Sequence, residues 1–152
     1  MNSANYVDIY QTTILSHNKS PKNFGKITNP CCSFHGQNQM CGDYVILHMN
    51  FEEKEPSKEI LTNLSFEGEG CAILMASSSM MTELLKGKNL MEIRELMNEF
   101  RKILYGEIEF CQNLGEINIF AGLSKFSSRI QCAMLSWETL IKGINNKCQK
   151  YQ

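Results

Sequence analysis

The sequence predicts an α+β fold in which a small antiparallel β-sheet carries helices packed on one face. Apolar residues alternate with a period of two in two stretches between Asp43 and Phe66, and they recur at helical spacing before and after these stretches. Strands followed by a run of helices are typical of this fold class. Because the chain has 152 residues and shows no internal repeat, we expect residues 1–152 to form a single domain.

A helix and a long loop are expected ahead of the sheet. The helix is indicated by side chains that recur three and four residues apart, namely Tyr6, Ile9, Tyr10, Thr13 and Ile14. Pro21, Gly25 and Pro30 end this helix and open a long connection, because proline and glycine interrupt regular structure. We therefore expect a short helix that docks on the domain, followed by a loop.

Two strands joined as a hairpin are expected to form the sheet. Their alternating faces consist of Val45, Leu47, Met49 and Phe51 in the first strand and Ile60, Thr62, Leu64 and Phe66 in the second. The polar stretch 52–59 is expected to be the connection between them.

Three helices are expected after the sheet. The first follows Gly70 and ends at Gly87, and its methionines are expected to fill the core. The second begins after Asn89, whose spacing to Glu92 indicates a capping box, and Gly106 ends it.

The last helix has the plainest start signal. Ser128 and Gln131 form an S-x-x-Q pattern, which predicts that the helix is capped at Ser128. Its apolar stripe consists of Ile130, Met134, Trp137, Ile141 and Ile144.

The composition indicates a soluble protein of a reducing compartment, which we expect to be the cytoplasm. The cysteine count is odd at 7, residues 1–5 lack the features of a signal peptide, and no apolar run approaches the roughly 18 residues of a membrane span. Cysteines in such a setting bind metal, act in catalysis or are buried. The net charge of −1 gives no basic surface, so neither nucleic acid nor a membrane is an expected partner.

Three cysteines and one aspartate are candidates for a common site. Cys41 and Asp43 lie two residues apart at the entry to the first strand, so their side chains can point to the same side, and Gly42 between them leaves room for close approach. Cys71 and Cys132 fall at or within the first turn of predicted helices, where unpaired N–H groups and the helix dipole favour a thiolate.

These donors suit a zinc ion or an iron–sulfur cluster. Three sulfurs and one oxygen satisfy tetrahedral zinc, and thiolates equally hold iron–sulfur clusters. Such soft donors exclude magnesium and calcium. The chain has no C-x-x-C pair, and the cysteines are widely separated, so the spacing leaves open both a shared metal site and three unrelated buried thiols.

Four segments resemble motifs of the IscU/SufU/NifU N-terminal family of iron–sulfur cluster assembly proteins. His17–Gly25 resembles the family's H-x-x-x-P-[RK]-N-x-G, and Cys41-Gly42-Asp43 resembles its CGD. Gly70–Glu83 resembles G-C-x-I-x-x-A-S-[AS]-S-M-M-T-[ED]. Gly122–Trp137 resembles the G-[VL]-x-K-F-x-x-R-I-K-C-x-x-L-x-W segment of the SufU subgroup. The four segments occur in the family's order along most of the chain.

The resemblance is to the SufU-like subgroup in particular. IscU proteins usually carry a histidine before the third cysteine and an LPPVK motif, whereas this chain has Gln131 and no LPPVK. The long region between Cys71 and Cys132 resembles the SufU insertion. SufU usually has lysine where Gln131 stands, which leaves Lys125 and Arg129 as the nearby cations that would support the site.

The resemblance implies a SufE/NifU-like fold and a protein that takes part in iron–sulfur cluster assembly. It implies zinc, or a transient iron–sulfur cluster, bound through Cys41, Asp43, Cys71 and Cys132. Its expected partners are a SufS-like cysteine desulfurase and apo iron–sulfur proteins, and the chain itself is expected to be a monomer or weak oligomer.

Two functions are open at this stage, and both differ from those of a conventional enzyme. The first is a sulfur acceptor, sulfurtransferase-like, in which Cys41 on its glycine-flanked loop accepts the persulfide sulfur. The second is a cluster scaffold or carrier without sulfur transfer. A hydrolytic zinc enzyme is disfavoured, because the protein fills the ligand set and leaves no position for water.

The remaining cysteines and histidines are not expected to bind the metal. Cys31 and Cys32 are adjacent loop residues and match no ligand of the family, while Cys111 and Cys148 are read as structural or incidental. Among the histidines, His17 is expected to form hydrogen bonds rather than to ligate, His35 to lie in a loop and His48 in a strand.

Overall fold

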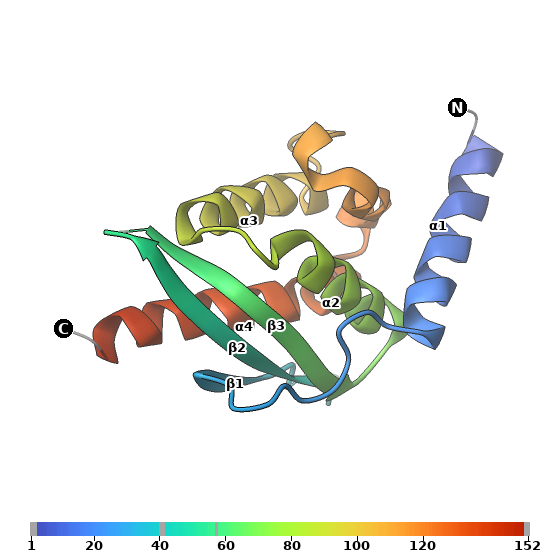
Figure 1. Cartoon of the computed structure of the whole chain (residues 1–152). Coiled ribbons are helices and arrows are strands. Elements are labelled where there is room, and N and C mark those ends of the chain that lie inside the picture. Colours follow the sequence, from blue (N-terminus) through green and yellow to red (C-terminus); the bar gives the residue numbers. More distant parts are fainter. Residues whose placement is uncertain (1–2, 40–41, 57, 151–152) are drawn as a thin grey trace.

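The computed structural model describes residues 3–39, 42–56 and 58–150, with side chains described from residue 7 to residue 146 outside the same gaps. The elements follow the order α1 (Ser3–Lys19), β1 (Cys32–Gln37), β2 (Tyr44–Glu55), β3 (Lys58–Glu69), α2 (Ala72–Leu85), α3 (Leu90–Leu104), the 3-10 helix η1 (Gln112–Lys125) and α4 (Ser127–Lys150) (Figure 1).

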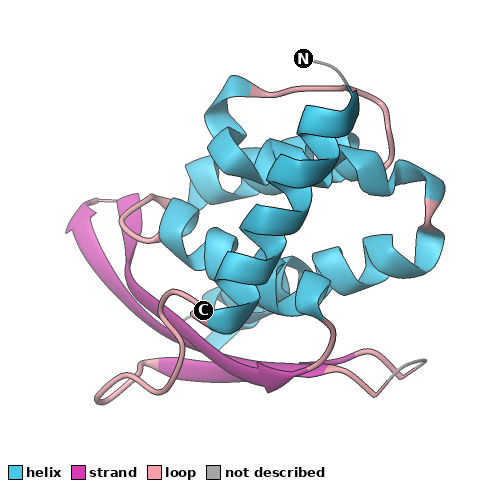
Figure 2. Ribbon diagram, turned by 90° about the vertical axis from the view of Figure 1, so that its right-hand side faces the viewer, coloured by secondary structure: helices cyan, strands magenta, loops and turns pink. Residues whose placement is uncertain are grey.

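The described strands form one antiparallel sheet in the order β1-β2-β3. Leu47 is the central partner in the register, since it pairs with Phe34 of β1 on one side and Phe66 of β3 on the other. The helices lie on one side of this sheet (Figure 2). The predicted α+β fold, with a small antiparallel sheet and helices on one face, is therefore confirmed.

The core lies between the inner face of the sheet and the helices. Val45, Leu47 and Met49 alternate toward the helices and are buried, as the period of two predicts. On the helical side, the rings of Phe100 and Trp137 stack with their centroids 4.4 Å apart, which joins α3 to α4. Offset aromatic pairs of this kind add stability beyond the burial of their apolar area.

The two predicted strands are longer than the hydrophobic pattern indicates. The stretch 52–59, expected to be a connection, continues both strands, with Glu53 paired to Glu59 and Glu55 to Lys58. Backbone hydrogen bonds hold this projecting end of the hairpin, and its side chains are mostly exposed. Where both faces of a strand are exposed, apolar and polar residues do not alternate, so the sequence does not indicate the strand.

The strand β1 lies in a region expected to be a loop, and that expectation is wrong. Only two of its three inward positions, Cys32 and Phe34, carry an apolar side chain, and the third is Gly36. A Cβ at Gly36 would overlap the Oγ1 of Thr139 on α4, so the close approach of helix and strand requires glycine there. The local pattern is therefore too weak to indicate a strand.

The helix boundaries confirm one predicted cap and contradict another. At α3, the Asn89 side chain accepts a hydrogen bond from the Glu92 backbone N–H, and the Glu92 carboxylate accepts one from the Asn89 N–H, which is the expected capping box. At α4, the helix already includes Ser127, so Ser128 is not its N-cap. Cys132 consequently lies in the second turn of α4 rather than in the first.

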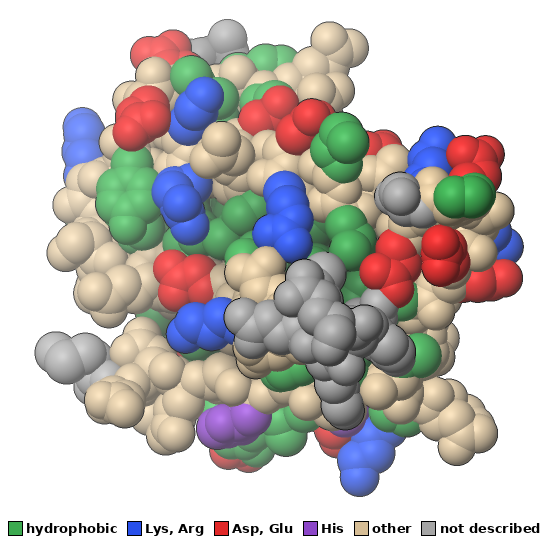
Figure 3. Space-filling view, turned by 90° about the vertical axis from the view of Figure 1, so that its left-hand side faces the viewer, with side chains coloured by type: hydrophobic (Ala, Val, Ile, Leu, Met, Phe, Trp, Pro, Cys, Tyr) green, Lys and Arg blue, Asp and Glu red, His purple; other side chains and the backbone are tan. Residues whose placement is uncertain are grey.

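The surface shows no strong separation of charge on the face that Figure 3 presents. Acidic and basic side chains are interspersed there, with hydrophobic groups between them (Figure 3), in keeping with the net charge of −1. None of the helices in the described part of the chain combines the length and the hydrophobicity that a membrane span requires.

The contact between Gly36 and Thr139 can be tested through stability. We expect Gly36→Ala to lower the free energy of unfolding by about 1–3 kcal/mol, because an added methyl group overpacks this contact. Thr139→Ala in the same chain should recover part of the loss, which a double-mutant cycle in urea would measure. The control is Gln37→Ala at an exposed position of the same strand. A loss in Gly36→Ala no larger than in the control would contradict the packing argument.

Candidate metal centre

Asp43 is held at the start of β2 by a tight turn. The Gly42 N–H donates to the Asn38 carbonyl over 2.9 Å, and the Asn38 N–H donates to the Asp43 carbonyl over 2.8 Å. Gly42 has a φ of 75°, a backbone conformation that side-chain-bearing residues rarely adopt. The chain thus turns at Gly42 instead of extending through it, and this turn brings Asp43 into a position where it is only 8% exposed.

Cys71 lies where β3 passes into α2. It is the N-cap residue of α2, as the sequence predicts, and its side chain makes no capping hydrogen bond. Since Tyr44 pairs with Glu69 in the sheet, the start of β2 and the end of β3 are adjacent. The sheet register therefore brings Asp43 and Cys71 together, although they are 28 residues apart in the sequence.

Cys132 approaches the same point from α4, and Ser77 of α2 fixes the helix there. The Ser77 hydroxyl donates a hydrogen bond of 2.7 Å to the Ala133 carbonyl and accepts one of 3.2 Å from the indole N–H of Trp137. All three groups are buried. Because Ala133 follows Cys132 directly, these hydrogen bonds help to set the distance between Cys71, the N-cap of α2, and Cys132 of α4.

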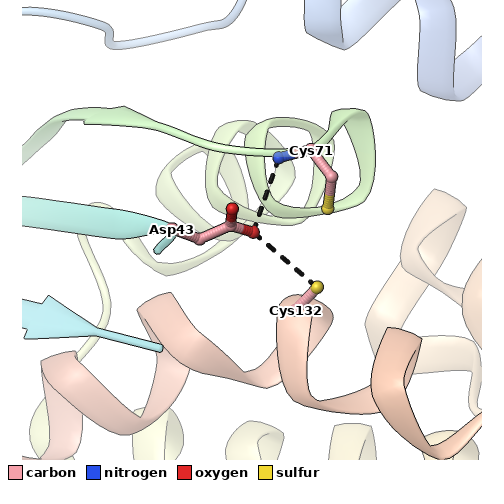
Figure 4. Close-up of side chains that lie close together, drawn as sticks. All are labelled: Asp43, Cys71 and Cys132. Atoms are coloured by element: carbon pink, nitrogen blue, oxygen red, sulfur yellow. Dashed lines mark hydrogen bonds between the residues drawn. The ribbon is translucent and has the colours of Figure 1, made fainter. Parts of the chain in front are cut away.

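The three side chains converge (Figure 4). One ligand atom from each of Asp43, Cys71 and Cys132 lies within 4.8 Å of the other two. The Cys132 Sγ is 3.8 Å from Asp43 Oδ2, and the Cys71 backbone N–H makes a long contact of 3.5 Å to the same oxygen. The ligand atoms of a tetrahedral zinc ion lie about 3.5–3.8 Å apart, so two thiols and a carboxylate that already lie within 4.8 Å of one another suit the ion after a small adjustment.

Gly70 makes room for the carboxylate. A Cβ at Gly70 would lie 2.7 Å from Asp43 Cγ and 2.6 Å from Leu74 Cδ2. Both distances are shorter than real carbon contacts allow, so a larger residue would displace Asp43 or the first turn of α2. The sequence motif includes Gly70, but its role in spacing emerges only when Asp43 is seen beside it.

The three side chains of the centre differ in their exposure to solvent. Asp43 is buried, Cys132 is partly exposed and Cys71 is exposed. The carboxylate therefore forms the inner side of the centre, and the Cys71 sulfur lies on the side open to solvent.

The other residues predicted for the site are placed as follows. Cys41 lies outside the described residues. Lys125 and Arg129 are exposed at the junction of η1 and α4, and the Arg129 guanidinium lies over the Phe126 ring, 5.0 Å from its centroid. Arg129 precedes Cys132 by three residues and so shares a face of α4 with it.

The remaining cysteines that the structure describes lie apart from the candidate metal centre. Burial and a 2.8 Å hydrogen bond from its Sγ to the Glu99 carboxylate raise the pKa of Cys111, which therefore stays a thiol at neutral pH. Cys31 is exposed just before β1 and Cys32 begins that strand, at the end of β1 that pairs with Met49, far along the sheet from Asp43. The Cys148 side chain is outside the described ones.

The histidines are engaged in hydrogen bonds. His17 contacts Ser79 and Glu116, and His48 contacts Ser33 and Glu67. The expectations of a hydrogen-bonding His17 and a strand position for His48 are confirmed. His35 lies in β1, so its assignment to a loop is wrong for the same reason that the strand was missed.

Comparison with known proteins decides the family. A family model described as the NifU-like N-terminal domain matches residues 9–133. The chain belongs to this family.

The most informative relatives point to the SufU-like branch. The chain is 38% identical to the zinc-dependent sulfurtransferase SufU of Bacillus subtilis (strain 168), over 93% of each protein. It is 33% identical to the iron–sulfur cluster assembly scaffold protein IscU of Streptococcus pyogenes serotype M1, over 90% of this chain and 82% of that protein.

A solved structure supports the same assignment. The crystal structure of a putative iron–sulfur cluster assembly scaffold protein for the SUF system from Fervidobacterium islandicum AW-1 shares 35% identity and a TM-score of 0.74 with this chain, covering 88% of this chain and 94% of that one. The resemblance inferred from the four sequence motifs is thereby confirmed.

The spacing role of Gly70 yields a prediction about metal affinity. Gly70→Ala should weaken zinc binding by about 10–100-fold, as the loss of a supporting contact commonly does, because it displaces the Asp43 carboxylate. Competition with a chromophoric chelator measures the affinity. Glu69→Ala, at the exposed neighbouring position, serves as the control. Equal zinc affinities in the two variants would show that Gly70 does not position the carboxylate.

Proposed function

We propose that this protein is a zinc-dependent sulfur acceptor in iron–sulfur cluster assembly, supplied with sulfur by a cysteine desulfurase. The observation that supports this most is the convergence of two thiols and one carboxylate from three separate elements, with one sulfur exposed to solvent. The identity of 38% to a zinc-dependent sulfurtransferase along nearly the whole chain supports the same function.

The zinc would be held by Asp43, Cys71 and Cys132, with Cys41 as the fourth ligand. Cys41 precedes Asp43 by two residues, next to the turn at Gly42, and completes a three-sulfur, one-oxygen set. Zinc, when bound, keeps its thiolate ligands deprotonated at neutral pH. Binding must therefore release the thiol protons, including the one that Cys132 donates toward Asp43.

The sulfur transfer itself is a thiol exchange. The Cys41 thiolate attacks the outer sulfur of the desulfurase persulfide, a new S–S bond forms on Cys41, and the old S–S bond breaks with its electron pair on the desulfurase cysteine. No net oxidation occurs. The product is a persulfide on Cys41 and a thiolate on the partner, ready for another turnover.

The surface beside the centre suits a protein partner. Phe126 is exposed and carries Arg129 over its ring, and Lys125 precedes it, so an apolar group and two cations lie at the start of α4, the helix that carries Cys132. We propose that this rim contacts the desulfurase, and that apo iron–sulfur proteins receive the product. We propose a cytoplasmic location, where cysteines stay reduced and available as metal ligands.

A scaffold function is the second candidate. Two similar proteins carry that description in their names, and thiolate ligands are those that iron–sulfur clusters require. In that case the cluster is a cargo assembled at the same residues and handed on. The exposed Cys71 side would serve as the exit, because nothing described covers it.

The zinc assignment can be tested with point variants of the ligands. Protein purified in air should hold about one zinc per chain, and Cys71→Ser and Cys132→Ser should lose most of it, because each removes one of the few ligands of a tetrahedral ion. Cys31→Ser, an exposed cysteine away from the centre, is the matched control and should keep its zinc. Elemental analysis gives the answer, and full zinc content in both ligand variants would exclude this centre.

Desulfurase turnover separates the acceptor from the scaffold. Alanine production by the partner desulfurase should rise in the presence of this protein, and Cys41→Ala should abolish the rise by removing the acceptor thiolate. Cys31→Ala should leave the stimulation nearly intact. Stimulation that survives in Cys41→Ala and is lost in Cys31→Ala would show that Cys31, and not Cys41, accepts the sulfur. Cluster uptake on anaerobic reconstitution without any stimulation would favour the scaffold.

A further inference from the structure

A second group of potential ligands lies where α1, α2 and η1 meet. It consists of His17 near the end of α1, Glu83 of α2 and Glu116 of η1. One ligand atom from each lies within 4.8 Å of the other two. His17 is 7% exposed, whereas both glutamates are exposed. An imidazole set into the protein thus faces two carboxylates that are open to solvent.

The imidazole is held in a fixed orientation. Its Nδ1 lies 2.6 Å from Ser79 Oγ, and that hydroxyl also accepts a 2.8 Å hydrogen bond from the Lys22 backbone N–H. Its Nε2 points the other way, to Glu116 Oε1 at 2.7 Å. In metal sites one ring nitrogen of a histidine is commonly hydrogen-bonded to the protein and the other is directed at the ion. An ion bound here would therefore replace the hydrogen bond between Nε2 and Glu116 and leave the one to Ser79 in place.

The two carboxylates share this space with the imidazole. Within the described part of the chain, no lysine or arginine forms an ion pair with Glu83 or Glu116. Like charges at such a separation repel, and the imidazole contacts only the Glu116 carboxylate by hydrogen bond. A divalent cation would offset the repulsion and use all three groups.

We propose that His17, Glu83 and Glu116 form a second metal site that binds a divalent first-row transition ion. One nitrogen and two carboxylate oxygens suit manganese, iron(II), cobalt or zinc, with open positions for water. The donors are harder than the thiolates of the first centre. Glu83 follows Cys71 by twelve residues, which corresponds to about 18 Å along α2, so the two centres bind independently.

Manganese is the probe that separates the two centres, because thiolate sites favour softer ions. Protein already loaded with zinc is titrated with Mn²⁺, and the free ion is followed by electron paramagnetic resonance. We expect about one Mn²⁺ per chain to bind with the zinc retained, and the melting temperature to rise, since the ion joins α1, α2 and η1 in the folded state only.

The decisive variant is Glu83→Gln. Glu83 has no part in the hydrogen bonds that hold His17, so the variant leaves that structure intact. It should weaken Mn²⁺ binding at least about tenfold and remove the manganese-dependent rise in melting temperature. Glu95→Gln, at an exposed carboxylate of α3, is the control and should bind as the unaltered protein does.

Two outcomes would overturn the proposal. If zinc-loaded protein binds no stoichiometric Mn²⁺, the three residues form only a hydrogen-bonded link between helices. If Glu83→Gln binds as tightly as Glu95→Gln, the ion lies elsewhere. Neither outcome bears on the sulfur acceptor, whose zinc content and desulfurase stimulation are read separately.

Discussion

The hydrogen bonds of one buried serine hold the candidate centre together. Ser77 donates to the Ala133 carbonyl and accepts from Trp137, and so ties α2 to α4 at a place where apolar packing alone would allow the helices to slide. Two of the candidate ligands lie on these helices. Cys71 is the N-cap of α2, and Cys132 lies one residue before Ala133 on α4. A buried hydroxyl that both donates and accepts a hydrogen bond is held in one orientation, because leaving either partner unpaired in the core is costly. By fixing α2 relative to α4, Ser77 therefore helps to hold Cys71 and Cys132 at a constant separation.

The third donor depends on the sheet rather than on the helices. Asp43 is placed by the pairing of β2 with β3 and by the turn at Gly42, and Gly70 provides the space it occupies. The centre is therefore assembled at the point where sheet and helices meet, and no single element contributes two of its described ligands. A disturbance of either layer would reach a metal bound here, which would couple metal binding to the fold of the whole domain.

The sequence predicts those features whose signals are local. The alternation in Val45, Leu47 and Met49 and the capping box of Asn89 each depend on residues close in the chain, and both are confirmed. The strand β1 is missed because Gly36 is selected by the approach of Thr139, about a hundred residues away. Ser77 and Gly70 lie within a recognised motif, yet their roles come from contacts with α4 and with Asp43, which no spacing rule reveals. The spacing of Asp43, Cys71 and Cys132 does not group these residues, whereas the family resemblance does, and the structure brings their side chains together.

The mixture of donors in the centre has a chemical consequence. Thiolates bind zinc and iron strongly, while a carboxylate is a harder and weaker ligand for such ions. In this protein the weaker ligand is the buried one, and an exposed thiol stands on the solvent side. The Cys71 backbone N–H lies 3.5 Å from the Asp43 oxygen, and it is a donor that would still be available to the carboxylate on leaving a bound metal. Exchange of Asp43 as a ligand would then cost little, because the carboxylate need not be left buried and unpaired. For the proposed function, such a centre would favour the acceptance and release of a cargo over permanent retention.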